Sequence, residues 1–179
     1  MQLTLVQKQA LKADINASEV AGEPNNDTGN AVILAAYNAL ASPNYWVWRT
    51  SVSRADVYNA QNDLTVSGAQ TGFWSWTTYK NQGATEQNAW VQMFMGDLAD
   101  FSKKNLRDGV TAIFTGSAQA TAQRDHVLAI GRRLATRCEK LFSVDTPGSG
   151  AGRGTAADPD TLTLEGLLTL TNIEEARNS

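Results

Sequence analysis

The sequence ATAQRDHVLAIGRRLATRCEKLF, residues 120–142, is the longest uninterrupted helical pattern in the chain. Its basic residues lie mostly on one side of such a helix, and five basic against two acidic residues give the segment a net charge of +3. Its apolar residues recur mostly at three- and four-residue spacing on the other side: Val127, Leu128, Ile130, Leu134, Cys138, Leu141 and Phe142. The pattern predicts one continuous helix at the centre of a helical domain.

The length and composition are those of a globular protein with one domain. The chain has 179 residues, of which 42% are hydrophobic and 18% charged, and its formal net charge is −3. This charge does not favour DNA or an anionic membrane through bulk electrostatics. No apolar run approaches the ~18 residues of a membrane span, and the first residues lack the apolar core of a signal peptide. A single cysteine, Cys138, excludes an internal disulfide and indicates a reducing compartment.

Before residue 120, the pattern predicts several shorter helices. Thr4 and Gln7 have capping-box spacing, which predicts a helix to about residue 17 that presents Val6, Leu11 and Ile15. A second helix, residues 29–41, is apolar almost all round, so we expect it to be buried. Residues 45–52 alternate with period two and favour a short extended segment, although a helical turn fits nearly as well. Further helices are expected at residues 54–61, 86–98 and 105–115.

Five tryptophans suggest a core or an interface built on large rings. Trp90 shares a helical stripe with Met93, Phe94 and Leu98, which predicts a core position. The remaining tryptophans form two Trp-x-Trp pairs, at 46 and 48 and at 74 and 76. Core positions are the usual role of such rings, but two pairs in one small domain favour partial exposure against a neighbouring subunit.

The composition changes after Ser143. A segment rich in glycine, residues 146–154, precedes leucines and threonines at residues 161–164 and 167–171 that alternate as in short strands. Two basic and six acidic residues give residues 143–179 a net charge of −4. We therefore expect a mainly α fold with one helical body, residues 1–142, and an extended C-terminal arm, residues 143–179, for which a short β-hairpin is one arrangement. A hairpin of this kind is marginal on its own, so we expect the arm leucines to be buried by a neighbour.

No residue pattern points to catalysis. The only histidine, His126, has no nucleophile elbow to accompany it, so a partly exposed helix residue is the simpler interpretation. No Walker A or dinucleotide fingerprint is present, and the carboxylate pairs have no recognisable metal spacing. We assign no catalytic, cofactor-binding or metal-binding residue and expect a protein that is not an enzyme. A hydrolase that uses His126 is a weak alternative.

Arg133, Arg137 and Lys140 are the best interaction feature, because their spacing aligns them along one side of the predicted helix. Three interpretations stay open. The row is a solvated face with local ion pairs, for example to Glu139, or it contacts an acidic partner, or it contacts DNA. The DNA interpretation makes residues 120–142 a recognition helix and predicts salt-sensitive binding.

The order of several segments resembles a group of small head and neck proteins of tailed bacteriophages. These segments are WVWRT at 46–50, WSW at 74–76, EQNAW at 86–90, VTAIFTG at 110–116, QR at 123–124 and RCEKLF at 137–142. In place of the F-E-G-like motif near the end of those proteins stand Leu164, Glu165 and Gly166. The matching residues are core and turn residues, so they indicate a lineage better than an activity.

The resemblance implies a structural role in the virion as a head–tail connector, or adaptor, that docks on the portal. Such connectors are helical and assemble as rings of about twelve copies, with an extended segment that reaches a neighbour. It implies portal, tail and neck proteins as partners, DNA that passes through the lumen without specific binding, and no membrane. Tail terminator, stopper and decoration protein remain alternatives. Besides Arg133, Arg137 and Lys140, we expect the interface to contain the arm leucines Leu162, Leu164, Leu167, Leu168 and Leu170.

Overall fold

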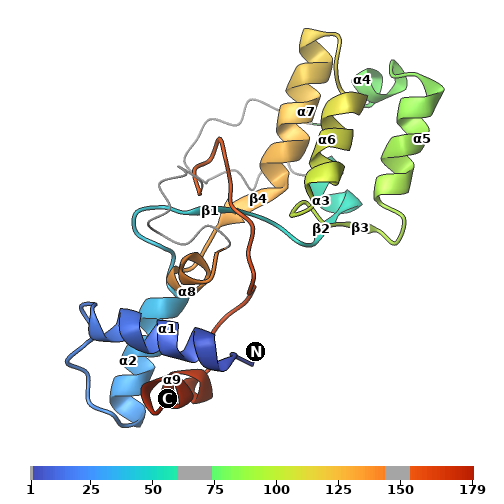
Figure 1. Ribbon diagram of the computed structural model, residues 1–179. Helices are drawn as coiled ribbons and strands as arrows, with labels where there is room; N and C mark the ends of the chain where they lie inside the picture. Colours follow the sequence, from blue (N-terminus) through green and yellow to red (C-terminus); the bar gives the residue numbers. More distant parts are fainter. Residues whose placement is uncertain (1, 60–73, 144–153) are drawn as a thin grey trace. The chain divides into compact units, whose positions relative to one another are not determined.

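A computed structural model describes residues 2–59, 74–143 and 154–179 (Figure 1). The predicted mainly α fold is confirmed. The chain forms two compact units where the sequence suggested one body and an arm: unit 1 contains residues 1–47 and 134–179, and unit 2 contains residues 48–133. The end of the helix expected at residues 54–61, and most of the glycine-rich segment at residues 146–154, lie outside the described residues.

Unit 1 contains four helices among its described residues: α1 (Leu5–Asn16), α2 (Asp27–Asn38), α8 (Arg137–Leu141) and α9 (Leu170–Arg177). The first and last parts of the chain meet here, because α9 packs against both α1 and α2, and α8 packs against α2. Their buried faces form one core of mainly aliphatic residues: Leu3, Leu11, Ile15, Val20, Ile33, Tyr37, Cys138, Phe142, Leu168, Ile173 and Ala176.

The start of α1 is as predicted, but one of its expected core residues is not buried. Thr4 and Gln7 form the capping box, and Leu11 and Ile15 are buried. Val6 is exposed, because it lies five residues before Leu11, which is about 140° round the helix. The second helix is also less buried than expected: α2 buries one face only and leaves Val32 exposed.

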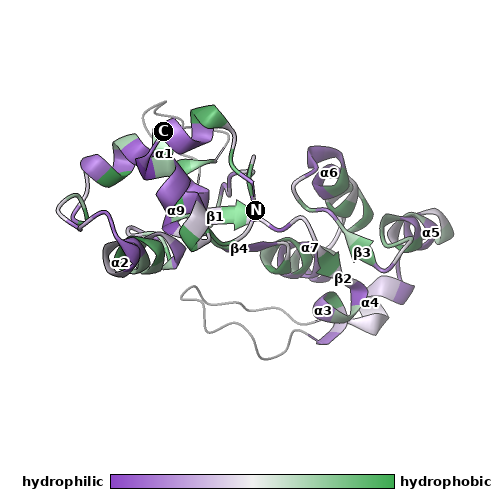
Figure 2. Cartoon of the chain, turned by 90° about the horizontal axis from the view of Figure 1, so that it is seen from below, coloured by the Kyte–Doolittle hydropathy of each residue, from purple (hydrophilic) through white to green (hydrophobic). Residues whose placement is uncertain are grey.

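Unit 2 consists of helices packed round aromatic rings. Its helices among the described residues are α3 (Arg54–Asn59), α4 (Trp76–Lys80), α5 (Ala84–Met93), α6 (Lys104–Ile113) and α7 (Ala118–Ile130), and α6 packs between α5 and α7. Figure 2 shows the hydrophobic and hydrophilic sides of α6 clearly. The core includes Trp74, Trp90, Phe94, Phe101 and Phe114, so the predicted core position of Trp90 is correct. Leu98, expected on the same stripe, is exposed.

Short strands accompany the helices, as the period-two pattern at residues 45–52 suggested. β1 (Trp46–Trp48) pairs with β4 (Arg132–Leu134), and β2 (Val52–Ser53) pairs antiparallel with β3 (Leu98–Ala99). In the β2–β3 pair, Val52 lies opposite Ala99 and Ser53 opposite Leu98.

The continuous helix predicted at residues 120–142 is wrong. α7 ends at Ile130, β4 follows, and α8 begins at Arg137. Gly131 follows α7 and leaves room for the buried ring of Phe101, because a Cβ at this position would lie only 2.3 Å from that ring. The Gly131 carbonyl accepts a 2.8 Å hydrogen bond from the Arg49 amide. A second capping box, Thr136 with Glu139, then starts α8. The segment in which apolar spacing predicted one helix therefore contains α8, most of α7 and the strand between them.

The C-terminal segment is not an extended arm, and its described residues form no hairpin of their own. Residues 160 and 162 make isolated bridges to Val47 and Ser143, and the second expected strand, residues 167–171, leads into α9. Thr169 and Asn172 form a capping box at the start of α9. This helix-start signal lies within the residues whose alternation predicted a strand. The expected division at residues 142 and 143 therefore differs from the two observed units, because residues 154–179 complete the core of unit 1.

Candidate interaction surface

Six large hydrophobic side chains of unit 1 are exposed among its described residues, and five of them lie at the start of α1, just after α2 and at the start of α9. The exposed fractions of these five range from 42% to 74%. They are Leu5 and Val6 at the start of α1, Leu40 just after α2, and Leu167 and Leu170 at the start of α9. We refer to these five residues as the apolar strip.

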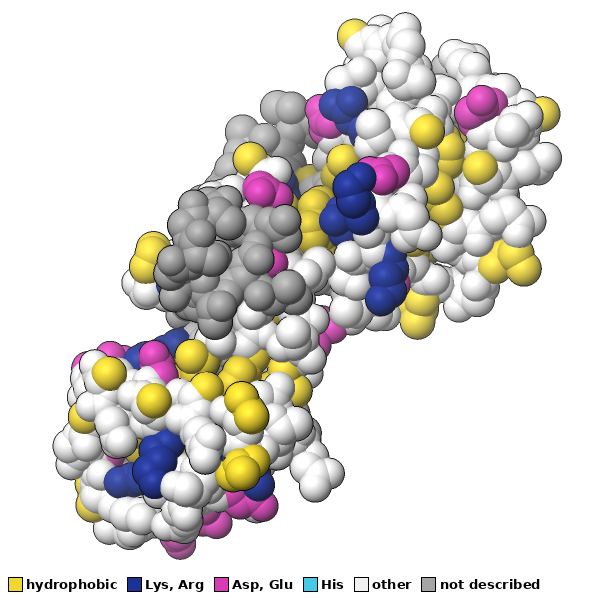
Figure 3. All heavy atoms as spheres, in the orientation of Figure 1, with side chains coloured by type: hydrophobic (Ala, Val, Ile, Leu, Met, Phe, Trp, Pro, Cys, Tyr) yellow, Lys and Arg dark blue, Asp and Glu magenta, His cyan; other side chains and the backbone are white. Residues whose placement is uncertain are grey.

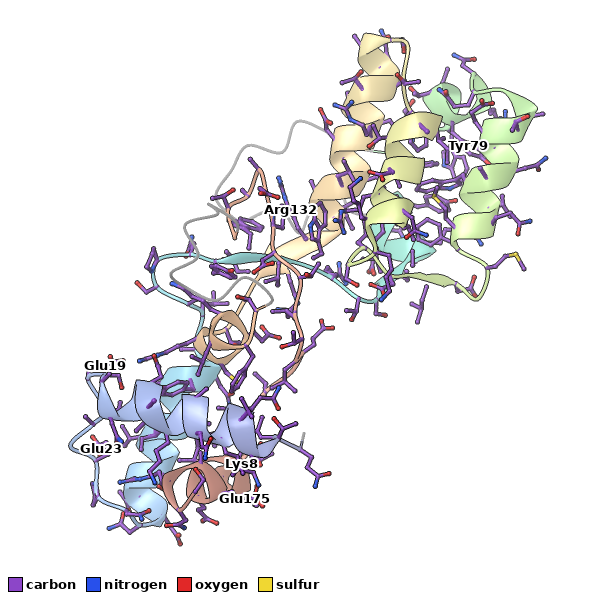
Figure 4. All side chains as sticks on the ribbon, viewed as in Figure 1. Lys8, Glu19, Glu23, Tyr79, Arg132 and Glu175 are labelled. Carbon is purple, nitrogen blue, oxygen red and sulfur yellow. The ribbon has the colours of Figure 1, made fainter. Side chains whose placement is uncertain are left out.

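The ends of α1 and α9 lie together because the two helices run parallel. The Lys8 ammonium lies 3.0 Å from the Glu175 carboxylate, and Lys12, one turn later, donates to the Ser179 carbonyl. Figure 4 shows Lys8 and Glu175 side by side. Since both contacts advance by four residues in each segment, the first turn of α1 lies beside the first turn of α9. Leu5 and Leu170 therefore lie in neighbouring turns, whereas Val6 lies about 160° round α1 from Lys8 and faces away from α9.

A pair of hydrogen bonds brings the end of α2 to the same segment. The Asn38 amide donates to the Leu168 carbonyl at 3.1 Å and accepts from the Leu168 amide at 2.9 Å. Leu40 lies two residues after Asn38, and Leu167 lies one residue before Leu168, so these hydrogen bonds hold the two exposed leucines in neighbouring segments. Figure 3 shows hydrophobic side chains gathered on the face of unit 1 over α1. Exposed apolar patches of this kind commonly mark interaction sites.

The five predicted interface leucines fall into three classes. Leu168 is buried in the core of unit 1, so it is not available to a partner while this segment stays in place. Leu162 and Leu164 are half-buried, and Leu164 packs against the same core. Leu167 and Leu170 are exposed. The expectation that a single copy leaves all five leucines exposed is wrong, because α9 and α2 of the same chain cover part of the segment.

Arg137 is engaged within unit 1. Its guanidinium lies 3.2 Å from the Asp14 carboxylate, donates to Glu19, and stacks 4.4 Å above the ring of Tyr37. The Tyr37 hydroxyl donates to Asp14, and burial together with this hydrogen bond raises the pKa of Tyr37. Burial disfavours the charged form of Arg137, but its anionic neighbours outweigh that effect and raise its pKa. The network attaches α8 to α1 and to the segment that follows it.

The three basic residues predicted to form a row do not share a helix. Arg133 is in β4, whereas Arg137 and Lys140 are in α8. The Lys140 ammonium lies 5.6 Å from the centre of the Tyr45 ring. The row as predicted is therefore wrong in its geometry, because the helix that was to align it ends at Ile130.

Glu139 has a role that the sequence analysis missed. It is buried, and its carboxylate accepts hydrogen bonds from the amides of Thr136 at 3.0 Å and Gly166 at 3.1 Å. The Gly166 amide belongs to the Leu-Glu-Gly sequence at residues 164–166, and Gly166 has a left-handed φ of 118°. The capping-box spacing of Thr136 and Glu139 in the sequence indicates the contact with the Thr136 amide. It does not indicate the contact with Gly166.

The single histidine and the single cysteine are both buried. His126 is 3% exposed, and its Nε2 lies 3.2 Å from the Val57 carbonyl oxygen, so it is not the partly exposed residue that was expected. Cys138 is buried as expected, and burial raises the pKa of its thiol to about 12. Of the tryptophan pairs, Trp74 is buried and Trp76 is half exposed. Among the described residues, no group of three or more His, Cys, Asp or Glu side chains is placed to hold a metal ion.

Comparison of the chain with protein families, with characterised proteins and with solved structures finds no match. In the described part of the chain, no helix has the length and apolar character needed to cross a membrane.

Proposed function

We propose that the protein is a structural component of a tailed-phage virion, a head–tail connector that docks on the portal as a ring. The observation that carries the proposal is the apolar strip, which residues from three parts of the chain build and which the chain itself leaves exposed. Water contact with each such side chain is unfavourable by about 25 cal/mol per Å² of apolar surface, so a partner that covers the strip gains this free energy.

The resemblance of the chain to phage head and neck proteins supports other virion proteins as its partners. Its matching segments include residues 46–50 and 110–116, which contribute Val47, Val110 and Phe114 to buried positions. Lineage and surface together favour assembly with other copies and with portal, tail or neck proteins. Tail terminator, stopper and decoration protein are alternatives of the same structural class.

DNA binding and hydrolysis receive less support from the geometry. The proposed recognition helix ends at Ile130, and Arg137 is occupied by Asp14 and Glu19. Hydrolysis would require His126, which is buried against Val57. A connector whose lumen passes DNA should show no salt-sensitive specific binding to duplex DNA at micromolar protein, as measured by fluorescence anisotropy.

The direct test is the oligomeric state of the purified protein, measured by light scattering and by electron microscopy of stained particles. We expect rings for the parent chain and monomers for the double variant Leu5→Asp with Leu170→Asp, since two carboxylates in a buried apolar contact are strongly unfavourable. Val32→Asp is the matched control, because Val32 is an exposed hydrophobic residue of unit 1 outside the strip.

A parent chain that stays monomeric, alone and with its portal protein, would contradict the proposal. If the double variant forms rings equally well, the apolar strip is not part of the contact that builds the ring. Labelling of intact virions with an antibody against the protein should place it at the head–tail junction, whereas labelling over the whole capsid would favour a decoration protein.

A further inference from the structure

Asp158 and Pro159 form the only Asp-Pro bond of the chain, and unit 1 holds the residues on both sides of it. The Trp46 amide donates to the Gly154 carbonyl at 2.7 Å, and the Asp160 amide donates to the Trp46 carbonyl at 2.9 Å. Pro159 and Asp160 are buried, whereas Asp158 is exposed. The bond is therefore open to water on its Asp158 side and fixed on both flanks.

Two backbone amides point at the carbonyl oxygen of this bond. The Gly154 amide donates to the Asp158 carbonyl at 2.9 Å, and the Thr155 amide donates to the same oxygen at 3.2 Å. The Thr155 hydroxyl in turn accepts a 3.0 Å hydrogen bond from the Asp158 amide. Paired backbone amides of this kind stabilise a carbonyl oxygen that gains negative charge in a transition state, as in an oxyanion hole.

Gly154 and Tyr45 hold the first of these amides in place. Gly154 is buried and has a left-handed φ of 80°, and a Cβ at this position would overlap the ring of Tyr45. The Tyr45 hydroxyl donates to the Asp160 carboxylate at 2.7 Å. One side chain thus contacts the residues before and after the Asp-Pro bond.

The Asp158 carboxylate is not engaged by the fold. It is exposed, and within the part of the chain that the structure describes it forms no hydrogen bond or ion pair. Its attack on the main-chain carbonyl carbon of the same residue closes a five-membered ring, and intramolecular reactions of this kind have a high effective molarity. The leaving group is the nitrogen of a tertiary amide, which departs as the secondary amine of proline.

We propose that the chain cleaves itself between Asp158 and Pro159. A carboxylate oxygen of Asp158 attacks its own carbonyl carbon, and the amides of Gly154 and Thr155 stabilise the oxyanion that forms. The bond from this carbon to the proline nitrogen then breaks, the nitrogen takes a proton from water, and a cyclic anhydride of Asp158 remains. Water hydrolyses the anhydride and leaves two carboxyl groups on the new C-terminal residue. The reaction occurs once per chain and does not depend on the proposed connector role.

The two products should stay associated after the cut. Residues 159–179 contribute Leu168, Ile173 and Ala176 to the core of unit 1. The hydrogen bonds of Trp46 to residues on either side of the cut also remain possible. Cleavage therefore converts unit 1 into a complex of two chains without the loss of its core.

Mass spectrometry of the purified full chain, incubated in mildly acidic buffer, tests the reaction. We expect two fragments, residues 1–158 and 159–179, whose masses together exceed that of the chain by one water molecule. They should elute together in native size-exclusion chromatography and separate in denaturant. The same chain unfolded in guanidinium chloride is the reference, because it keeps the Asp-Pro bond and loses the paired amides. The folded chain should be cleaved at least about tenfold faster, since one such donor typically contributes ~10²–10³ in rate.

Three variants identify the groups that act. Asp158→Ala removes the nucleophile and should abolish cleavage. Asp158→Glu keeps the charge but closes a larger ring, so the folded variant should be cleaved more slowly than the parent. Gly154→Ala displaces the Gly154 amide and should slow cleavage of the folded chain only, because the paired amides are absent from both unfolded chains. Circular dichroism of each variant checks that its helices are kept.

Several results would overturn the proposal. Equal rates in the folded and unfolded parent chain would mean that the bond has only the reactivity of any Asp-Pro sequence, and an intact folded chain would exclude the reaction. Cleavage of Asp158→Ala at the parent rate would exclude the carboxylate as nucleophile. An unchanged rate in folded Gly154→Ala would exclude the paired amides as an oxyanion hole. None of these results bears on ring formation, so the connector proposal stands or falls separately.

Discussion

Units 1 and 2 differ in how their cores are assembled from the chain. The core of unit 2 is formed by one continuous stretch, residues 48–133, and consists largely of aromatic rings in contact with one another. The core of unit 1 combines two ends of the chain, and its large residues are mainly aliphatic. Unit 2 thus contains everything that its core needs, whereas each half of unit 1 depends on the other.

Removal of residues 144–179 should have the largest effect and should act on unit 1 alone. The cut removes Leu168, Ile173 and Ala176 from the core of unit 1, together with the hydrogen bonds of Arg177 to Glu23, Pro24 and Asn30. We expect α1 and α2 to lose protection in hydrogen exchange while α5, α6 and α7 keep theirs. This result would differ from the division expected from the sequence, in which residues 1–142 form the helical body and residues 143–179 a separate arm.

The control for this truncation is a chain that lacks only residues 178 and 179, which should stay folded in both units. A chain ending at residue 143 with intact α1 and α2 would mean that unit 1 does not need α9.

Trp90→Ala should produce the opposite pattern, with loss confined to unit 2. Trp90 is 1% exposed, donates to the Tyr58 hydroxyl at 3.2 Å, and contacts three other rings. Truncation of a buried tryptophan typically costs ~3–5 kcal/mol of unfolding free energy. Chemical denaturation followed by tryptophan fluorescence measures the loss. Trp76→Ala is the control, since Trp76 is half exposed and should cost clearly less; equal losses would contradict the assignment of Trp90 to the core.

Gly131→Ala tests the turn at which α7 ends. The backbone of Gly131 is right-handed, so alanine is allowed there, but its Cβ would lie 2.3 Å from the Phe101 ring. Overpacking of this kind typically costs ~1–3 kcal/mol. A lower melting temperature for unit 2 is the expected result. Gly22→Ala has no atom within 4 Å of the new Cβ and should melt like the parent, and a neutral Gly131→Ala would indicate that Phe101 moves easily.

The smallest expected effect concerns Glu19 and pH. A hydrogen bond from the Glu19 backbone and the charge of Arg137 lower the pKa of this carboxyl below 4.5. Because the folded pKa lies below the unfolded one, the stabilisation is present above pH ~4.5 and is lost as pH falls through the folded pKa. Glu19→Gln should therefore melt slightly below the parent at pH 7 and equally at pH 3. A difference that grows at acid pH would exclude this ion pair as its cause.

The sequence predicted local features well where one signal acted alone. The capping box of Thr4 and Gln7, the core position of Trp90 and the mainly α character are all present in the structure. The prediction failed where the periodicity of apolar residues and a capping box indicated different structures, because the capping box marked the true helix start. The capping boxes at Thr136 and Thr169 were present in the sequence, and each marks a helix start that the predicted long helix and hairpin concealed.

The candidate surface was less predictable, because it depends on contacts between distant residues. Leu167 and Leu170 were expected at an interface, and both are exposed, but Leu168 between them is buried. No local pattern shows that Asn38 would bind Leu168, or that α9 would lie parallel to α1. Leu5, Val6 and Leu40 were therefore missed, although the five-residue spacing of Val6 from Leu11 indicated that Val6 faces away from the core.

The dependence of unit 1 on α9 has a consequence for synthesis of the protein on the ribosome. The chain is made from the N-terminus, so unit 2 is complete and able to fold while residues 134–179 are still being added. α1 and α2 must wait for α9, because the core that they share is incomplete until Ile173 and Ala176 have left the ribosome. The exposed apolar residues of unit 1 therefore come together later than the core of unit 2 can form, once residues 167–170 have left the ribosome.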